Sequence, residues 1–307
     1  MLFQGIGHVL LNVRIFVWDL WLTLLNVLLP SLPKAKDDGE KGRWPEWAAP
    51  KEGDSRCACP ALNAMANHGI LPHDGKGVKF TDMAARVHET YNFAPTFAAF
   101  VARNGADTLK RDYSKDTFDL AELDLHNGIE HDASLLRQDA YFSPSQSTPH
   151  LPLVDALLAS ASGTAPDGSR ALTAADLSAF SSKRRADSKR ENPQFVLDKT
   201  HAVFGSAKCV SFPNASIADD DVGSSSTLLA IFGGHVPDLE VFLREERLPR
   251  AWQSVCRARK GLTFFAFNGT TLKVERGIDE AKYERERAEK EAAPETQGEK
   301  EVEQGVN

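Results

Sequence analysis

The first 30 residues, MLFQGIGHVLLNVRIFVWDLWLTLLNVLLP, are apolar over a length that could cross a membrane. Their polar side chains recur three, four or seven residues apart, so they share one stripe of a helix: Gln4, His8, Asn12, Asp19, Thr23 and Asn26. An aspartate and an arginine would be costly in the lipid centre, and no small-residue cleavage site follows the apolar stretch.

We therefore expect residues 1–30 to form a membrane-associated helix. It either lies in the interface or spans the bilayer with its polar stripe against protein. A helix packed on the protein's own surface is the alternative, and a cleaved signal peptide is less favoured. The expected location is an endomembrane such as that of the endoplasmic reticulum, with secretion less favoured.

Composition divides the rest of the chain into a linker, one domain and a tail. Residues 31–56 are rich in proline and charge and predict a linker, and residues 57–278 have the pattern of one folded domain. Residues 279–307 hold ten acidic and five basic side chains, which give −5 of the formal net charge of −7. We expect this tail to be disordered apart from a short helix before Pro294. No basic stripe with interleaved aromatics is present, so nucleic acid is not an expected partner.

Helix signals dominate the domain. Thr173 followed by Asp176 is an acidic variant of the capping box. Further helix patterns occupy residues 81–91, 95–105, 224–234 and 238–248. Asn268-Gly269 lies between the strand-like segments LTFFAF and TTLKVE and predicts a hairpin. The predicted fold class is mainly α, a single helical domain with a short C-terminal β-hairpin.

One of the 4 cysteines stands directly before a proline, in Cys59-Pro60. Pro60 suits the first position of a helix, which places Cys59 at the N-cap with backbone amides pointing at its sulfur. The positive end of the helix is expected to lower the pKa of this thiol. A thiolate there could attack a substrate, exchange disulfides or bind a soft metal, and an inert buried cysteine is the plain alternative. Elsewhere, a Cys209–Cys256 disulfide is possible.

A second cluster packs Glu130, His131, Asp132 and Ser134 into five positions. On a helix, Glu130 and Ser134 would share one face and could bind a hard cation through oxygen. His131, next to two carboxylates, could transfer protons. For an isolated Glu-His-Asp, a solvated charged turn would be the better interpretation.

Taken together, CPALNAMANHGILPHDG (residues 59–75) and NGIEHDASLLRQD (residues 127–139) resemble the fungal haem-thiolate peroxidases of the chloroperoxidase and unspecific peroxygenase family, which include haem haloperoxidases. The resemblance covers roughly residues 43–255, including NPQF, TLLAIFGG and FLREERLPRAW. It implies a mostly α-helical fold and a haem b cofactor.

The same resemblance implies roles for the two clusters. Cys59 looks like the proximal ligand of the haem iron, and Glu130 and Ser134 look like ligands of a Mg²⁺ or Mn²⁺ ion bridged to a haem propionate. His131 and Asp132 would lie on the distal side and tune the acid–base group there.

Two departures from the family pattern stand out. Ala58 replaces the first proline of Pro-Cys-Pro, a minor change because Pro60 still starts the helix. In addition, the family's distal glutamate, in F-G-S-x-E, has no counterpart on either side of an insertion at residues 208–223. The flanks offer Lys208 and Ser224 instead, and the insertion contains three aspartates at 219–221.

The expected function is a peroxidase or peroxygenase that uses hydrogen peroxide to oxidise a small organic substrate, in fungal secondary metabolism of the aromatic polyketide or mycotoxin type. Without the glutamate, a haem-dependent dehydration, cyclisation or isomerisation is an alternative, as is a haem-binding protein without catalysis. Phe93, Phe97 and Phe100 could line an aromatic pocket or belong to the core. The expected partners are the small substrate, peroxide and a membrane surface contacted by residues 1–30.

Overall fold

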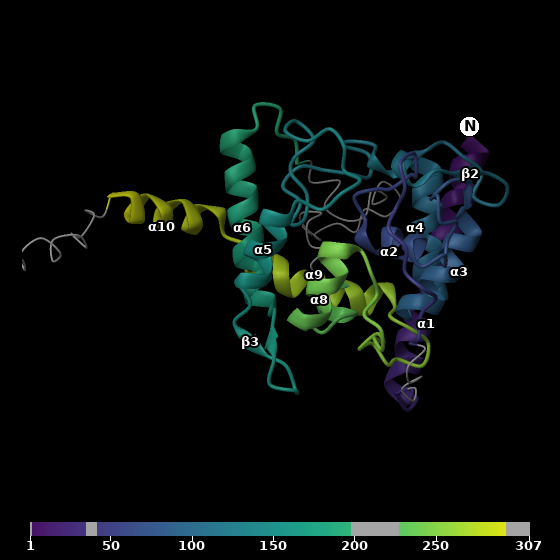
Figure 1. Ribbon diagram of the computed structural model, residues 1–307. Coiled ribbons are helices and arrows are strands. Elements are labelled where there is room, and N and C mark those ends of the chain that lie inside the picture. Colours follow the sequence, from purple (N-terminus) through teal and green to yellow (C-terminus); the bar gives the residue numbers. More distant parts are fainter. Residues whose placement is uncertain (1, 35–41, 198–226, 293–307) are drawn as a thin grey trace, which may run out of the picture.

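A computed structural model describes residues 2–34, 42–197 and 227–292 of the 307-residue chain. Helices build the domain around one apolar core, as the sequence predicts (Figure 1). The helices are α1 (Leu2–Leu28), α2 (Pro60–Asn67), α3 (Phe80–Tyr91), α4 (Pro95–Thr108), the 3₁₀ helix η2 (Leu120–Asp124), α5 (Leu151–Ala159), α6 (Ala174–Glu191), α8 (Val236–Glu245), α9 (Phe264–Glu275) and α10 (Glu280–Ala292). The antiparallel strand pairs are β1 (Val78–Lys79) with β2 (Thr117–Phe118), and β3 (Gly163–Thr164) with β4 (Arg170–Ala171).

The predicted helix starts are confirmed at two positions. Thr173 caps α6: its hydroxyl accepts a hydrogen bond from the Asp176 N–H, and the Asp176 carboxylate accepts one from the Thr173 N–H. Helix α2 begins at Pro60 with Cys59 at the N-cap. The helix expected from Thr81 begins one residue earlier, at Phe80.

The C-terminal hairpin expected over residues 262–275 is wrong, because this segment forms helix α9. The Thr263 hydroxyl caps the helix by accepting from the Ala266 N–H at 3.4 Å. Phe267, Thr271 and Val274 are buried at spacings of four and three residues, which is a helical period. Tertiary packing of this face therefore outweighs the turn preference of Asn-Gly, and the short strand pairs lie elsewhere.

Just before α8, the backbone at Gly234 packs closely against the backbone that follows β4, and a side chain at this position would clash. Gly234 has φ +70°, and a Cβ added there would lie 2.1 Å from the Leu172 carbonyl oxygen. The Leu172 N–H in turn donates to the Gly234 carbonyl at 2.8 Å. This close approach fixes the entry of the chain into α8.

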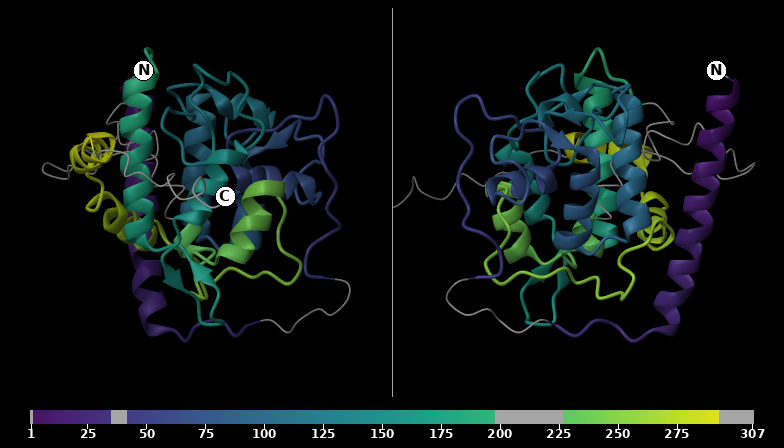
Figure 2. Two further views of the ribbon diagram at one scale, coloured as in Figure 1. Left: turned by 60° about the vertical axis from the view of Figure 1, so that its left-hand side comes forward. Right: turned by 90° about the vertical axis from the view of Figure 1, so that its right-hand side faces the viewer.

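Helix α1 runs along one side of the domain and contacts α4 and α9 (Figure 2, right). Its segment Leu11–Leu28 is long and apolar enough to cross a membrane, by length and composition only. From Asn12 to Asn26 the polar stripe faces the domain, where Asp19 is completely buried. The structure thus shows the alternative, a helix packed on the protein's own surface, with an apolar outer face, and membrane association stays a prediction.

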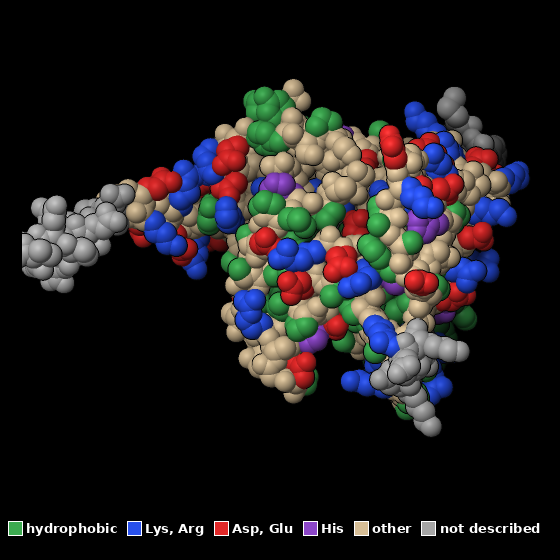
Figure 3. Space-filling view, viewed as in Figure 1, with side chains coloured by type: hydrophobic (Ala, Val, Ile, Leu, Met, Phe, Trp, Pro, Cys, Tyr) green, Lys and Arg blue, Asp and Glu red, His purple; other side chains and the backbone are tan. Residues whose placement is uncertain are grey.

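Helix α10 extends away from the other helices, and none of its residues is buried (Figure 1). Acidic and basic side chains cover its visible face (Figure 3). Ion pairs such as Arg190 with Glu284, at 3.1 Å, connect it to α6. This helix is the one expected before Pro294, and residues 293–307 lie outside the described part of the chain.

Candidate functional site

A cavity of about 390 Å³ opens between α2, α3, α4, α9 and the loop that follows η2. Most of its wall is apolar, with Phe93 just before α4, Phe97 on α4 and Phe267 on α9. Among the described lining residues there is no lysine or arginine. Such a mostly apolar cavity with a few polar groups is typical of a small-molecule or cofactor site.

Cys59 points its thiol into this cavity from the start of α2. Its side chain is exposed, yet the exposure is to the cavity, and the surrounding protein desolvates a thiolate there. Burial therefore raises the pKa of Cys59, although the backbone N–H groups of Leu62 and Ala61 act to lower it. The expectation of a lowered pKa is wrong for the protein without a ligand on the sulfur, because desolvation outweighs the helix start.

The neighbouring Cys57 differs sharply from Cys59. It is 1 % exposed, and its sulfur lies 3.6 Å from the Asn63 side-chain oxygen. Burial raises the pKa of Cys57 well above its usual range, so this residue remains a neutral thiol. Of the two sulfurs, only that of Cys59 offers an accessible donor to the cavity.

A buried polar network behind α2 fixes the cysteine segment. The Asn63 side chain accepts from the Cys57 N–H at 3.0 Å and donates to the Cys57 carbonyl at 2.7 Å and to Glu246 Oε1 at 2.8 Å. Arg137, 2 % exposed, donates to the same Glu246 oxygen at 2.7 Å. The network joins the cysteine segment, Arg137 of the segment 127–139 and Glu246 of FLREER, which are far apart in the sequence, so sequence reasoning did not find it.

The acidic cluster lies on a loop, so the expectation that Glu130 and Ser134 share a helical face is wrong. Ala133 adopts the left-handed conformation at φ 61° and interrupts any helix. Glu130, His131 and Ser134 still line the cavity together. Asp132 does not: it is fully buried, and its Oδ2 accepts from the Val196 N–H at 3.0 Å.

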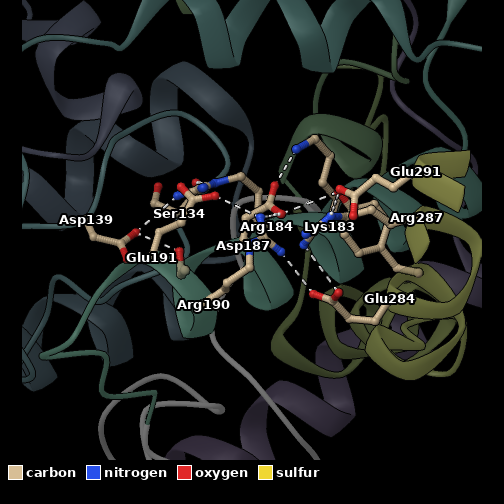
Figure 4. A network of polar contacts seen from close by, with 12 residues as sticks. Ser134, Asp139, Lys183, Arg184, Asp187, Arg190, Glu191, Glu284, Arg287 and Glu291 are labelled. Carbon is tan, nitrogen blue, oxygen red and sulfur yellow. Dashed lines mark hydrogen bonds and ion pairs between the residues drawn. The ribbon is translucent and has the colours of Figure 1, made fainter.

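Asp139 anchors this loop to α6. It accepts from the Ala133 N–H at 3.0 Å and from Arg184 at 3.1 Å, and its other partners are Ser188 and Asn192. Arg184 also donates to the Ser134 carbonyl at 2.9 Å. Figure 4 follows these contacts along α6 to the ion pairs with α10.

Two carboxylates, Glu130 and Asp124, belong to the cavity wall, whose described residues include no lysine or arginine. Glu130 is 4 % exposed, and its Oε1 has no hydrogen-bond partner among the described residues. Burial raises the pKa of Glu130, while His126 and its hydrogen bond to Oε2 at 2.6 Å lower it. Burial also raises the pKa of Asp124 to about 6, although its Oδ1 accepts from the Ala58 N–H at 2.7 Å. Two such groups favour an added cation.

His131 is the polar side chain of the cavity best suited to transfer protons. Its Nδ1 lies 2.8 Å from the Asp132 carbonyl oxygen. Because a carbonyl can only accept, we assign the proton to Nδ1, which leaves a lone pair on Nε2 when the ring is neutral. His131 can therefore accept a proton at Nε2 and release it again.

Sequence reasoning missed Asp124 and His126. The signal for His126 was present, since it stands four residues before Glu130. Asp124 carried no such signal, because only the fold brings η2 beside the cysteine segment. Of the three phenylalanines considered for an aromatic pocket, Phe93 and Phe97 line the cavity, whereas Phe100 is buried in the core.

Several expectations fall on residues 198–226, outside the described part of the chain. These are the motif FGSA, the insertion at 208–223 with its three aspartates, both flanking residues Lys208 and Ser224, and Cys209 of the possible disulfide with Cys256. They stay predictions.

Comparison with known proteins finds a family described as "Peroxidase, family 2", which matches residues 45–257. Chloroperoxidase from Leptoxyphium fumago is 59 % identical over 32 residues, covering 10 % of this chain and 9 % of the relative. A dothistromin biosynthesis peroxidase from Dothistroma septosporum is 37 % identical over 60 residues, covering 20 % and 14 % respectively.

An aromatic peroxygenase from Coprinellus radians is 28 % identical over 131 residues, covering 38 % of this chain and 48 % of the relative. The aligned parts thus span less than half the length of these curated relatives. The family match, in contrast, takes in both clusters of the cavity and most of the described domain, so the resemblance seen in the sequence is confirmed. The chain belongs to peroxidase family 2, the chloroperoxidase family.

Proposed function

We propose that this protein is a haem-thiolate peroxidase or peroxygenase that uses hydrogen peroxide to oxidise a small organic substrate. The observation that carries the proposal is the Cys59 thiol, held at a helix start and facing an apolar cavity of about 390 Å³. The chloroperoxidase family is haem-dependent, and the proposed cofactor here is haem b.

The residues around the cavity fit this cofactor. Cys59 supplies the soft sulfur donor, and the apolar wall suits a flat, largely apolar macrocycle. A metal bound to sulfur would also favour the thiolate, which the protein alone disfavours by raising the pKa of Cys59. When bound, thiolate-ligated haem supplies the redox chemistry that cleaves the peroxide O–O bond.

A divalent cation, Mg²⁺ or Mn²⁺, is the second proposed cofactor, with Glu130 and Ser134 as its ligands. The unpartnered Glu130 Oε1 and the absence of lysine or arginine from the described cavity wall support it. Within the described residues no group of three or more His, Cys, Asp and Glu side chains could hold a metal alone. This suits Mg²⁺, which keeps several waters and takes few protein carboxylates.

We assign proton transfer on the distal side to His131, through Nε2. Asp132, expected to share this role, is fully buried and does not line the cavity. We propose it as a positioning residue, since its carbonyl orients the His131 ring and its carboxylate accepts from the Val196 N–H.

A small aromatic substrate is proposed because aromatic side chains form part of the cavity wall. Phe93 and Phe97 have ring centroids 5.1 Å apart, and Phe97 and Phe267 have centroids 5.0 Å apart. One relative is named for dothistromin biosynthesis, which supports a role in fungal secondary metabolism of aromatic compounds. Membrane association of residues 1–30, at an endomembrane, is also proposed, because α1 exposes an apolar face.

The test is peroxide-dependent oxidation of a small aromatic probe, such as naphthalene, by the full chain expressed with haem supply. His131→Gln should lower turnover by about 10²–10⁴-fold, the usual contribution of a general acid–base group. His73→Gln, at a histidine beside Asp54 that does not line the cavity, should leave it unchanged. Turnover that needs no peroxide would favour the non-oxidative alternative, and bound haem without turnover the non-catalytic one.

A further inference from the structure

Helix α1 has two faces of opposite character. The outer face exposes large apolar side chains along its length: Val17 (65 %), Trp18 (56 %), Trp21 (49 %), Leu24 (50 %), Val27 (80 %) and Leu28 (77 %). From Val17 to Leu28 the exposed apolar stripe is about 17 Å long at 1.5 Å per residue, and Arg14 lies at its N-terminal end. A soluble monomer rarely leaves so continuous an apolar stripe uncovered, so a partner is expected to cover it.

The inner face contacts the domain through polar side chains as well as through apolar ones such as Phe16 and Leu22. The Asp19 carboxylate accepts from the Thr96 hydroxyl of α4 at 2.5 Å and from the Phe265 N–H of α9 at 3.3 Å. Asn26 donates to the Gly261 carbonyl at 2.9 Å and accepts from the Lys260 N–H at 2.7 Å. The polar stripe of the sequence is therefore the surface that docks α1.

We propose that α1 lies in the plane of a phospholipid bilayer surface, docked on α4 and α9 through its polar stripe, and that it does not cross the bilayer. The proposal rests on the membrane association proposed above and specifies its geometry. A helix that left the domain to cross the bilayer would carry Asp19 and Asn26 into hydrocarbon without their present partners. In the segment Leu11–Leu28, which is long enough to cross, Asp19 would lie at the bilayer centre.

The chemistry of the outer face fits lipid. Trp18 and Trp21 are both exposed on it, three residues apart, and tryptophan is enriched at the headgroup level of membranes. Arg14 of α1 is exposed. Arg259, from the loop before α9, is also exposed, and it lies near the C-terminal end of α1, where it donates to the Pro30 carbonyl. An apolar stripe with cationic side chains nearby suits an interfacial helix on an anionic membrane.

This placement puts the aromatic wall of the cavity on the membrane side. Phe16 of α1 contacts Phe264 of α9, with ring centroids 5.1 Å apart, and Phe264 contacts Phe97 at 5.6 Å. Phe97 lines the cavity itself. A single layer of aromatic side chains thus separates the bilayer-facing helix from the proposed substrate site.

Two measurements on the full haem-loaded chain test the proposal. The first is flotation with vesicles of phosphatidylcholine and phosphatidylserine. We expect Leu24→Glu to weaken binding at least tenfold and to leave peroxide-dependent turnover in solution unchanged. The matched control is Leu151→Glu on α5, where the leucine is 46 % exposed, and this variant should bind like the wild type.

The second measurement is protease protection of the chain synthesised with microsomes and tagged at both ends. An in-plane helix leaves the two tags on the same side, equally cleaved or equally protected, whereas opposite responses of the tags would mean that α1 crosses and would overturn the proposal. Absence of vesicle binding would overturn both the proposal and membrane association. A dimer that Leu24→Glu abolishes would assign the outer face of α1 to a second copy of the chain and would also overturn the proposal. None of these outcomes alters peroxide turnover, so failure here is separable from failure of the proposed enzyme.

Discussion

At position 59 the chain places a thiol where helices usually begin with serine, threonine, aspartate or asparagine. A hydroxyl would cap α2 at least as well, so the capping of this helix does not require sulfur. Burial raises the pKa of Cys59, and the metal-free protein therefore favours the neutral thiol at neutral pH. A thiolate here needs a cation on the sulfur, which is what a haem iron would provide.

The Asp124 carboxyl makes a pH-dependent contribution to stability. Burial raises its pKa from 3.8 in the ordinary carboxyl to about 6 in the folded protein. Because the folded state binds the proton more tightly, its contribution to the free energy of unfolding falls as the pH rises from about 4 to about 6. Asp124→Asn stays neutral and can still accept from the Ala58 N–H. The melting temperature of this variant relative to the wild type should therefore rise across this pH window in haem-free protein. A difference that does not depend on pH would contradict the prediction.

His126 is expected to position the Glu130 carboxylate for a divalent cation, through the contact of 2.6 Å between its Nδ1 and Oε2. Loss of such a supporting group usually costs about 10–100-fold in metal affinity. We expect His126→Ala to weaken Mn²⁺ binding by this factor in a titration followed by electron paramagnetic resonance. His73→Gln is the control, and equal affinity in both variants would exclude the positioning role.

At the scale of the elements, the sequence predicts helix ends better than it predicts helix faces. Thr173 and Pro60 mark their helices because capping and proline chemistry act locally. Asn268-Gly269 predicts a hairpin, but the segment forms a helix. The turn preference of these two residues stabilises less than the burial of Phe267 and Val274 on one helical face does. The loop conformation around Glu130 could not be predicted either, since the loop is fixed by hydrogen bonds to Asp139 and to Arg184, and Arg184 is about 50 residues away in the sequence.

His235 provides a test of how α8 is joined to the hairpin β3–β4. Burial lowers its pKa, but hydrogen bonds and charges from Asp238 on α8 and Asp167 in the hairpin turn outweigh this, and the pKa of His235 is raised. Its stabilising contribution is therefore fully present below the ordinary value of 6.5 and is lost as the pH rises through the raised pKa. His235→Gln should lower the melting temperature at pH 6 more than at pH 9. An equal loss at both values would show that the charge of His235 does not matter.

At the scale of the whole molecule, part of the expected linker packs on the domain, as the resemblance over residues 43–255 indicates and composition alone does not. Trp44, within the expected linker, lies with its ring centroid 6.1 Å from that of Trp252 and donates to the Trp252 carbonyl at 3.2 Å. The family match likewise begins at residue 45. Proline and charge made residues 31–56 resemble a linker, and the partners that anchor Trp44 are about 200 residues away, where sequence patterns give no signal.

Helix α1 is expected to stabilise the domain as well as to bind lipid. Phe16 and Leu22 pack against the core, and Asp19 is the partner of Thr96. A chain that begins at residue 34 would uncover Phe100 and Phe264, whose rings contact Phe16. We predict that this truncation lowers the melting temperature and speeds proteolysis of α9. An unchanged melting temperature would mean that α1 contributes nothing to the fold.

The most direct test of the haem-thiolate assignment is the ferrous–carbon monoxide spectrum of the full chain expressed with haem supply. Cys59→Ser is the informative variant, because serine preserves the N-cap of α2. Cys57→Ser, two residues away, is the matched control. We predict a red-shifted, thiolate-type Soret band in the wild type and in Cys57→Ser, and its loss in Cys59→Ser. An imidazole-type spectrum indifferent to Cys59, or a chain that binds no haem, would contradict the assignment.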